Sequence, residues 1–193
     1  MMLSSFILPS SDAPFISSNT IDFNNSSFEI YKLNNQILSI KSNKGNLNLD
    51  NQDFNFIGNV EGKFIIEGDT VRLKTESLSG NLIKNSISSE EKVLFEVKGL
   101  EIISRSMEII QVPQKELKIL FKNANFSKIN SISSVKKGKA NKIELFPSKD
   151  LIFMEGNAEL HEDNMKIISD EIHYDLSEDR ILKSINAKII NNL

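Results

Sequence analysis

Apolar and polar residues alternate along most of this chain from Ile21 onward. Short runs place an apolar residue at every second position, which is typical of a β-strand with one buried face. Clusters typical of turns separate the runs: Asp50-Asn51, Glu67-Gly68-Asp69, Lys137-Gly138, Pro147-Ser148 and Glu162-Asp163-Asn164. The pattern predicts strands of about six residues with a turn roughly every 8–12 residues, as in an all-β sandwich, barrel or roll.

One part of this pattern occurs twice. Residues 42–60 align without a gap with residues 140–158, and after a short length difference residues 71–78 align with 165–172. Neither copy contains a cluster of catalytic residues. A duplicated unit of this kind predicts stacked repeats of one β module, which usually binds along a surface rather than catalysing at a point.

Both copies contain a Gly-Asn pair, Gly58-Asn59 and Gly156-Asn157. The pair can form a tight hairpin turn, or it can lie inside a bent strand. The apolar residues on both sides keep the same parity, which favours the bent strand. In the second aligned segment Leu73 and Leu78 are out of parity, so a bulge or break is expected between them, and the same holds in the other copy.

Composition restricts the class of protein. The chain has 193 residues, of which 39% are hydrophobic and 25% charged, as in a globular protein. A net charge of −3 argues against a nucleic-acid partner, which usually meets a basic face. The absence of cysteine excludes disulfides and thiolate metal sites. No apolar stretch approaches the roughly 20 residues of a membrane span, and residues 1–8 do not resemble a signal peptide.

Candidate chemistry is sparse. His161 is expected in an exposed loop and His173 on the outer face of a strand, so these two histidines do not predict a metal site, and no cofactor is expected. The carboxylates between residues 170 and 179 are expected on a solvated face. The basic run 136–142 either meets an anionic ligand or forms a soluble turn, and the second interpretation is favoured.

The order and spacing of the motifs resemble a known family. Residues 137–145, 150–160 and 168–175 resemble the OstA/LptA-type repeat of lipopolysaccharide transport, with its apolar strand that ends in Gly-Asn-Ala. Upstream, the chain resembles the periplasmic domain of LptC at residues 54–60, 73–78, 87–93 and 98–102. The resemblance covers roughly residues 30–190.

This resemblance implies a β-taco, an open, twisted β-jellyroll in which two antiparallel sheets form a V. The expected domains are a flexible lead-in (1–20) and one elongated β-taco (21–193), LptC-like over about 21–130 and LptA/OstA-like over about 136–193. The implied protein is a non-enzymatic periplasmic carrier in the bridge that takes lipopolysaccharide from the inner to the outer membrane. It would be associated with the inner membrane, although no anchor is visible.

The implied partners are lipopolysaccharide, the permeases of the inner-membrane ABC transporter of the exporter, and other β-taco proteins that pair through edge strands. A different class of protein fits the same pattern: a structural β-repeat protein with a dry core and no lipid ligand. Apolar inner residues are required by both alternatives and do not decide between them.

Parity and the repeat alignment assign a set of residues to the inner, lipid-binding face. This expected groove consists of Phe54, Phe56, Val60, Phe64, Ile66, Val71, Leu73, Leu78, Ile152, Met154, Leu160, Ile167, Ile172 and Tyr174. At the C-terminus, residues 181–190 are expected to form one apolar edge strand, with Ile185, Ala187 and Ile189 facing inward. An edge strand of this kind predicts pairing with a neighbouring β-taco protein.

Overall fold

The computed structural model describes residues 16–17, 19–32, 35–66, 68–110, 117–129, 135–162 and 164–191. The fold is all-β, as predicted, and consists of a single 15-stranded antiparallel sheet. Most of the expected lead-in, residues 1–15, lies outside the described residues.

The elements have the following bounds. They are β1 (Ile16–Ser17), β2 (Thr20–Lys32), β3 (Asn35–Asn48), β4 (Asp53–Ile66), β5 (Asp69–Asn81), β6 (Ser86–Ser89), β7 (Val93–Val97), β8 (Leu100–Ser104), β9 (Ser106–Ile110), β10 (Lys118–Ile129), β11 (Val135–Phe146), the 3-10 helix η1 (Pro147–Lys149), β12 (Leu151–Glu162), β13 (Met165–Asp175), β14 (Arg180–Ile185) and β15 (Lys188–Asn191).

The principal strands are longer than the sequence pattern predicted. Strands β2–β5 and β10–β13 contain 11 to 14 residues each and are bent near their middle. Each bent strand therefore contributes one half to each of two arms of the sheet. Arm 1 contains residues 60–66 of β4 and the strand halves in register with them, and arm 2 contains residues 53–57 of β4 and the strand halves in register with them. Between these two sets, β7 and β8 belong to arm 1, while β6 and β9 belong to arm 2. At the C-terminal end β15 extends arm 1 and β14 extends arm 2.

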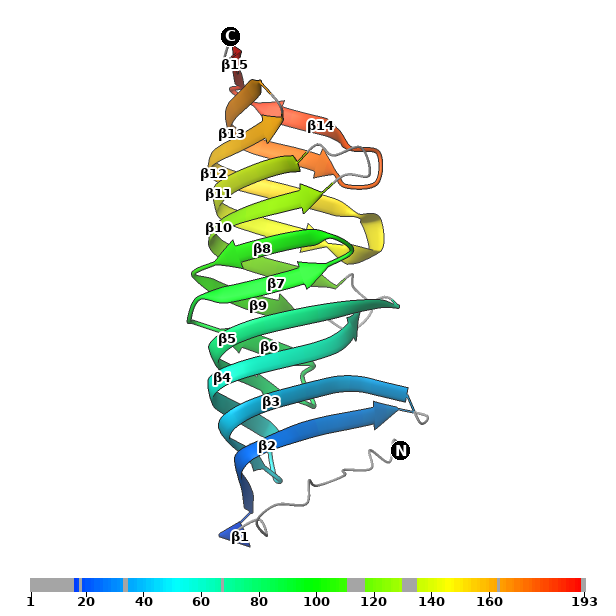
Figure 1. Ribbon diagram of the computed structural model, residues 1–193, viewed down its shortest axis with the longest axis vertical. Helices are drawn as coiled ribbons and strands as arrows, with labels where there is room; N and C mark the ends of the chain where they lie inside the picture. The colour runs from blue at the N-terminus through cyan, green and yellow to red at the C-terminus, as the bar shows by residue number, and fades with distance from the viewer. Residues whose placement is uncertain are drawn as a thin grey trace.

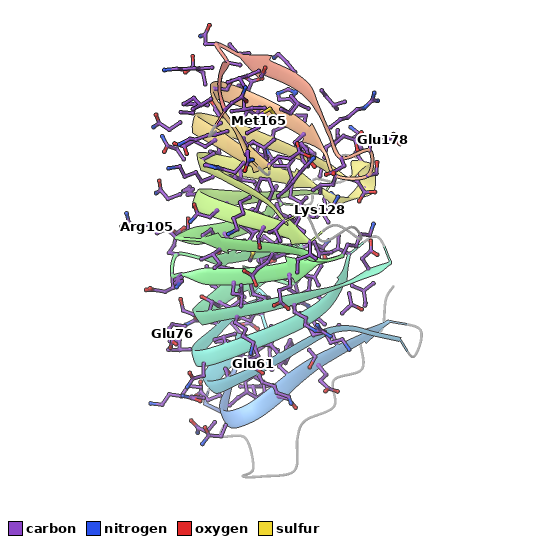
Figure 2. The ribbon with its side chains drawn as sticks, turned by 45° about the horizontal axis from the view of Figure 1, so that its top comes forward. Glu61, Glu76, Arg105, Lys128, Met165 and Glu178 are labelled. Atoms are coloured by element: carbon purple, nitrogen blue, oxygen red, sulfur yellow. The ribbon has the colours of Figure 1, made fainter. Side chains whose placement is uncertain are left out.

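The strands stack like rungs along the long axis of the molecule (Figure 1), with β7 and β8 in front of β6 and β9. The bends form a crease along one side. The hairpin turns lie at the far ends of the two arms and form two rims. In Figure 2, Glu76 and Arg105, which lie at bends, are on one side of the molecule, and Glu178, which lies in a turn, is on the other. The mouth of the V lies between the rims.

The Gly-Asn pairs produce two of the bends, as parity indicated. Gly58 and Asn59 lie inside β4 with φ values of 81° and 49°, and Gly156 and Asn157 have φ values of 75° and 50° inside β12. Asparagine tolerates this left-handed region better than most residues do. A Cβ on Gly58 would come within 2.9 Å of the Asn43 amide, and a Cβ on Gly156 would come equally close to the aligned Asn141. The repeat therefore duplicates a bend together with the asparagine that packs on it.

The expected break in parity is also confirmed. In β5 the buried positions change parity between Thr75 and Leu78, and in β13 they change between Ser169 and Ile172. In the pairing of β4 with β5 the register shifts between Ile57 and Val60. The inner face of each arm is therefore apolar up to the crease on both sides.

Three local predictions are wrong. Lys137-Gly138 is not a turn, because it lies inside β11 and pairs with β10. His161 is not in a loop but near the end of β12. The C-terminal strand is interrupted at Asn186, which has a φ of 55° and separates β14 from β15. Ile185 consequently lies opposite the outward Glu171, and it does not face inward.

Candidate functional site: the apolar interior between the two arms

All the residues of the expected groove are buried in the interior. Arm 1 contributes Val60, Phe64, Ile66, Val71, Leu73, Leu160 and Ile167, and arm 2 contributes Phe54, Phe56, Leu78, Ile152, Met154, Ile172 and Tyr174. They belong to one hydrophobic cluster that extends from Phe23 in β2 to Tyr174 in β13. The interior is therefore a continuous apolar strip through both copies of the repeat.

In the N-terminal half of the interior, aromatic side chains from the two arms pack against each other. Phe56 is only 1% exposed, and its ring centroid lies 5.5 Å from that of Phe28, which comes from the opposite arm. Phe23 and Phe54 complete the cluster, with ring centroids 6.3 and 5.6 Å from that of Phe56. Gly45 leaves room for this ring, because a Cβ at Gly45 would lie 2.4 Å from the Phe56 ring. Aromatic pairs at such distances add to the burial of area.

Similar contacts join the arms further along. Phe95 of arm 1 meets Phe121 of arm 2 edge to face, with ring centroids 5.1 Å apart. Phe126 of arm 1 stacks on Tyr174 of arm 2 at 6.4 Å. Gly138 is required beside Phe126, since a Cβ there would come within 2.2 Å of the ring. Side chains of the two arms thus fill the space between them.

Small hydroxyl side chains line part of the crease. The hydroxyl of Ser42 donates to the carbonyl of Lys44 at 2.9 Å, and that of Ser169 donates to the carbonyl of Glu171 at 2.8 Å. Thr75 and Ser89 share a buried hydrogen bond of 2.8 Å. These bonds satisfy polar groups where bending disrupts the strand ladder.

One charged side chain enters the interior at the mouth. Lys136 is buried, with its side chain only 3% exposed, and its ammonium contacts the carboxylates of Glu162 and Asp179, each at 3.0 Å. It also lies 5.1 Å from the centre of the Tyr174 ring. Burial opposes the charge, but these hydrogen bonds outweigh it and raise the pKa of Lys136. Lys136 remains charged because it is paired.

Sequence reasoning missed Lys136 because it stands in a run of exposed basic residues. A signal was present in the repeat: continuing the alignment back from residue 42 places Lys136 on Leu38, which is buried in the first copy. Parity gives the same result, because Gly138 and Ala140 share its face. The favoured interpretation of residues 136–142 as a soluble turn is therefore wrong at Lys136.

Two more lysines cross the mouth from arm 1. Lys98, in the turn after β7, bridges Asp69 of its own arm at 2.8 Å and Asp150 of arm 2 at 3.3 Å. Lys128 donates to the backbone carbonyl of Leu176 in arm 2. A pocket of about 220 Å³ lies beside them, with Val97, Leu100, Leu145, Pro147 and Leu176 among its lining residues.

The outer face carries ion pairs. Glu159 accepts from Lys166 at 2.7 Å and from Lys139 at 3.1 Å, and these bonds hold the pKa of Glu159 at about 2. His173 stacks on Phe153 with centroids 3.9 Å apart, so it lies on the outer face, as expected. These contacts lie on the outer surface, away from the apolar strip of the interior.

The described residues offer little for other kinds of site. They contain no group of three His, Cys, Asp or Glu side chains that could hold a metal ion. None of the helices in the part of the chain that the structure describes is long and apolar enough to cross a membrane.

Fold and interior together define a class: an elongated β-jellyroll of bent antiparallel strands, with an apolar strip enclosed between two arms. The sequence matches the model of the LptA/(LptD N-terminal domain) LPS transport protein family over residues 39–180, where LPS denotes lipopolysaccharide. The chain belongs to this family. The matched range spans both copies of the repeat, including the part that resembles LptC. Because the family consists of transport proteins, the chain is a transport protein and not an enzyme.

The comparison of structures agrees on the fold. The chain is similar to LptH from Pseudomonas aeruginosa, described as the LptA-homologous periplasmic component of the conserved lipopolysaccharide transport device. The TM-score is 0.55 at 11% sequence identity, and the similarity covers 62% of this chain and 93% of the LptH chain. A search of curated proteins found no match.

Proposed function

We propose that this protein is a periplasmic carrier that holds the acyl chains of lipopolysaccharide between its two arms. The observation that carries the proposal is the continuous apolar strip, which extends from Phe23 to Tyr174 through both copies of the repeat. The family supplies the identity of the cargo. An acyl chain leaving a membrane needs such an enclosure, because exposing it to water costs about 0.8 kcal/mol per CH₂ group.

In this proposal the protein binds lipid but supplies no energy for its transport. A lipid with several acyl chains would be held firmly, so movement towards the outer membrane requires energy from elsewhere. We assign this role to an ATP-driven transporter of the inner membrane, whose permeases would deliver lipid to this chain. Association with the inner membrane, and the division into an LptC-like part (21–130) and an LptA-like part (136–193), belong to the same proposal.

One observation favours the alternative, a structural protein with a dry core. The arms already fill each other's interior, with Phe28 against Phe56 and Phe95 against Phe121. Lipid binding therefore requires the arms to move apart and exchange contacts between side chains for contacts with acyl chains. Extraction of lipid from the purified protein, followed by mass spectrometry, distinguishes the two functions. Recovery of stoichiometric lipopolysaccharide supports the carrier, and its absence supports the dry core.

Phe56→Asp tests the location of the lipid. An unpaired carboxylate in this apolar site would repel acyl chains and also destabilise the fold. Thermal unfolding without lipid measures the second effect separately. Reduced binding of lipopolysaccharide by the folded fraction supports the carrier, whereas a loss of stability with unchanged affinity supports the dry core.

Other β-taco proteins would join at the last strands. Among the described residues, β14 and β15 pair only with β13, and Leu182 and Ile189 are 48% and 62% exposed. An edge with unpaired backbone groups accepts a further strand. Removal of residues 181–193 should abolish association with such a partner and leave residues 20–130 folded. Unchanged affinity would place the contact elsewhere, for example on the N-terminal edge around residues 21–33.

A further inference from the structure

The mouth of the C-terminal half is held by a row of three lysines. Lys98, Lys128 and Lys136 all belong to arm 1, and all three bind groups of arm 2. Their acceptors across the mouth are the carboxylate of Asp150, the carbonyl of Leu176, and both the carboxylate and the carbonyl of Asp179. We call these three residues the lysine row. In Figure 2, Lys128 lies nearer the side of Glu178 than that of Arg105.

The acceptors belong to two turns that are joined to each other. Residues 147–150 connect β11 to β12, and residues 176–179 connect β13 to β14. The N–H of Leu176 donates to the carbonyl of Asp150 at 2.7 Å, which links the two turns. We call the two turns the acceptor rim. Because they are bonded together, the lysine row holds the rim as one unit.

Apolar and charged side chains both line the pocket beside the lysine row. The pocket of about 220 Å³ includes Lys98, Lys128 and Asp150 at its edge, and Leu100 and Leu145 in its wall. Both leucines are almost fully buried and belong to the core. The volume is smaller than the roughly 300–1,000 Å³ of small-molecule sites. It suits the start of an acyl chain, and the rest would enter only when the acceptor rim moves away.

The contacts that hold the rim can be exchanged. Lys98 and Asp150 are both more than a third exposed, and ion pairs between exposed groups stabilise a protein little. Lys128 is held across the mouth by a neutral carbonyl. A phosphate monoester carries a charge of about −1.5 to −2 and three acceptor oxygens, so it competes well for both ammonium groups.

We propose that the lysine row and the acceptor rim form a gate operated by anionic lipid. Phosphate groups of an acylated, phosphorylated lipid bind Lys98 and Lys128 in place of their acceptors. The acceptor rim then moves away, and an acyl chain enters the interior through the pocket. The inference rests on the proposed function and deepens it by assigning the entry site in the C-terminal half. Lys136 holds the last turn until the other two contacts are exchanged.

Lys98 offers a matched pair of cross-links, because it bridges one aspartate of each arm. The chain has no cysteine, so introduced thiols are the only ones present. Lys98→Cys with Asp150→Cys, joined by a reducible bismaleimide, ties the arms together across the mouth. Lys98→Cys with Asp69→Cys, joined in the same way, links two positions of arm 1 and leaves the mouth free. Thermal unfolding of each linked protein shows that it is folded.

Entry is measured with a photoreactive amino acid at Met154, which lies in the C-terminal interior, and with purified lipopolysaccharide as the probe. Each linked protein is compared with the same cysteine variant before linking, since both variants lack Lys98. We expect the link across the mouth to abolish capture of lipid and reduction of the linker to restore the rate before linking, whereas the link within arm 1 should not change the rate of its own variant. Capture at the unlinked rate with the mouth tied would overturn the gate and leave the proposed function standing. Failure of the protein that retains Lys98, Asp69 and Asp150 to capture lipid at position 154 would overturn both.

The exchange of lysine partners has its own readout. In protein that retains Lys98 and Lys128, we expect lipopolysaccharide stripped of its phosphates to be captured about tenfold more slowly, the effect of one lost charge-assisted hydrogen bond. A link across the mouth should block both lipids equally. Equal rates for the two lipids in the protein that retains both lysines would overturn the role of the phosphates.

Discussion

Replacing Phe56 with alanine tests whether the two arms are closed against each other when no lipid is bound. The Phe56 side chain is 1% exposed and contacts the rings of Phe23, Phe28 and Phe54. Truncation of such a residue removes buried area and leaves a cavity, at a cost of about 3–5 kcal/mol. For a chain of this length each kcal/mol lowers Tm by roughly 2–4 °C, so we expect a decrease of about 6–20 °C.

The neighbouring residue provides the control. Ile57 is 51% exposed on the outer face, so Ile57→Ala should change the free energy of unfolding by only about 0.5 kcal/mol. Thermal and urea unfolding of lipid-free protein, followed by far-UV circular dichroism, measure both variants. If Phe56→Ala lowers Tm no more than Ile57→Ala does, the arms are already apart at this position in solution, and the closed interior described above is wrong.

Three further results are expected. Gly138→Ala should lower the free energy of unfolding by about 1–3 kcal/mol, because its Cβ would come too close to a buried ring. The control is Gly62→Ala, whose Cβ would make ordinary contacts of 3.5 Å and should be neutral or slightly stabilising. Urea unfolding measures both variants. The lowered pKa of Glu159, about 2, means that its stabilisation is present above pH 4.5 and lost as the pH falls towards 2. Glu159→Gln should therefore reduce stability at pH 7 and flatten its dependence on pH in that window; an unaltered acid profile would contradict this. Lys136→Met keeps the volume but removes the ammonium that the partly exposed carboxylates of Glu162 and Asp179 contact. A loss of about 1–2 kcal/mol is expected at pH 7, below the 3–5 kcal/mol of a fully buried pair; calorimetry that shows no loss would refute the role given to this lysine.

Much of the interior could be predicted from the sequence because period-two alternation fixes which face of a strand is buried. Parity assigned Phe56 and Met154 inward correctly, and the change of parity between Leu73 and Leu78 correctly indicated a bulge. The strand length was wrong because a bend and a turn have the same local signal. Asn123, like the Gly-Asn pairs, adopts a positive φ inside a long strand.

The charged contacts of the mouth could not be predicted in the same way. They join residues far apart in the sequence, such as Lys98 with Asp150 and Lys136 with Asp179. Which lysine meets which carboxylate depends on how the two arms face each other. Alternation along one strand carries no information on that arrangement. Parity identified the bends at the Gly-Asn pairs because backbone geometry is a local property, whereas the ion pairs of the mouth are not.

The central claim is that lipopolysaccharide acyl chains lie between the arms, and photo-crosslinking tests it most directly. A photoreactive amino acid replaces Phe56 or Met154 on the inner face, or Asn55 or Phe153 on the outer face of the same strands. With lipopolysaccharide present, we expect capture of the lipid from both inner positions and none from the outer positions. Equal capture from the two faces, or capture from the outer face alone, would contradict the assignment of the interior as the lipid-binding site.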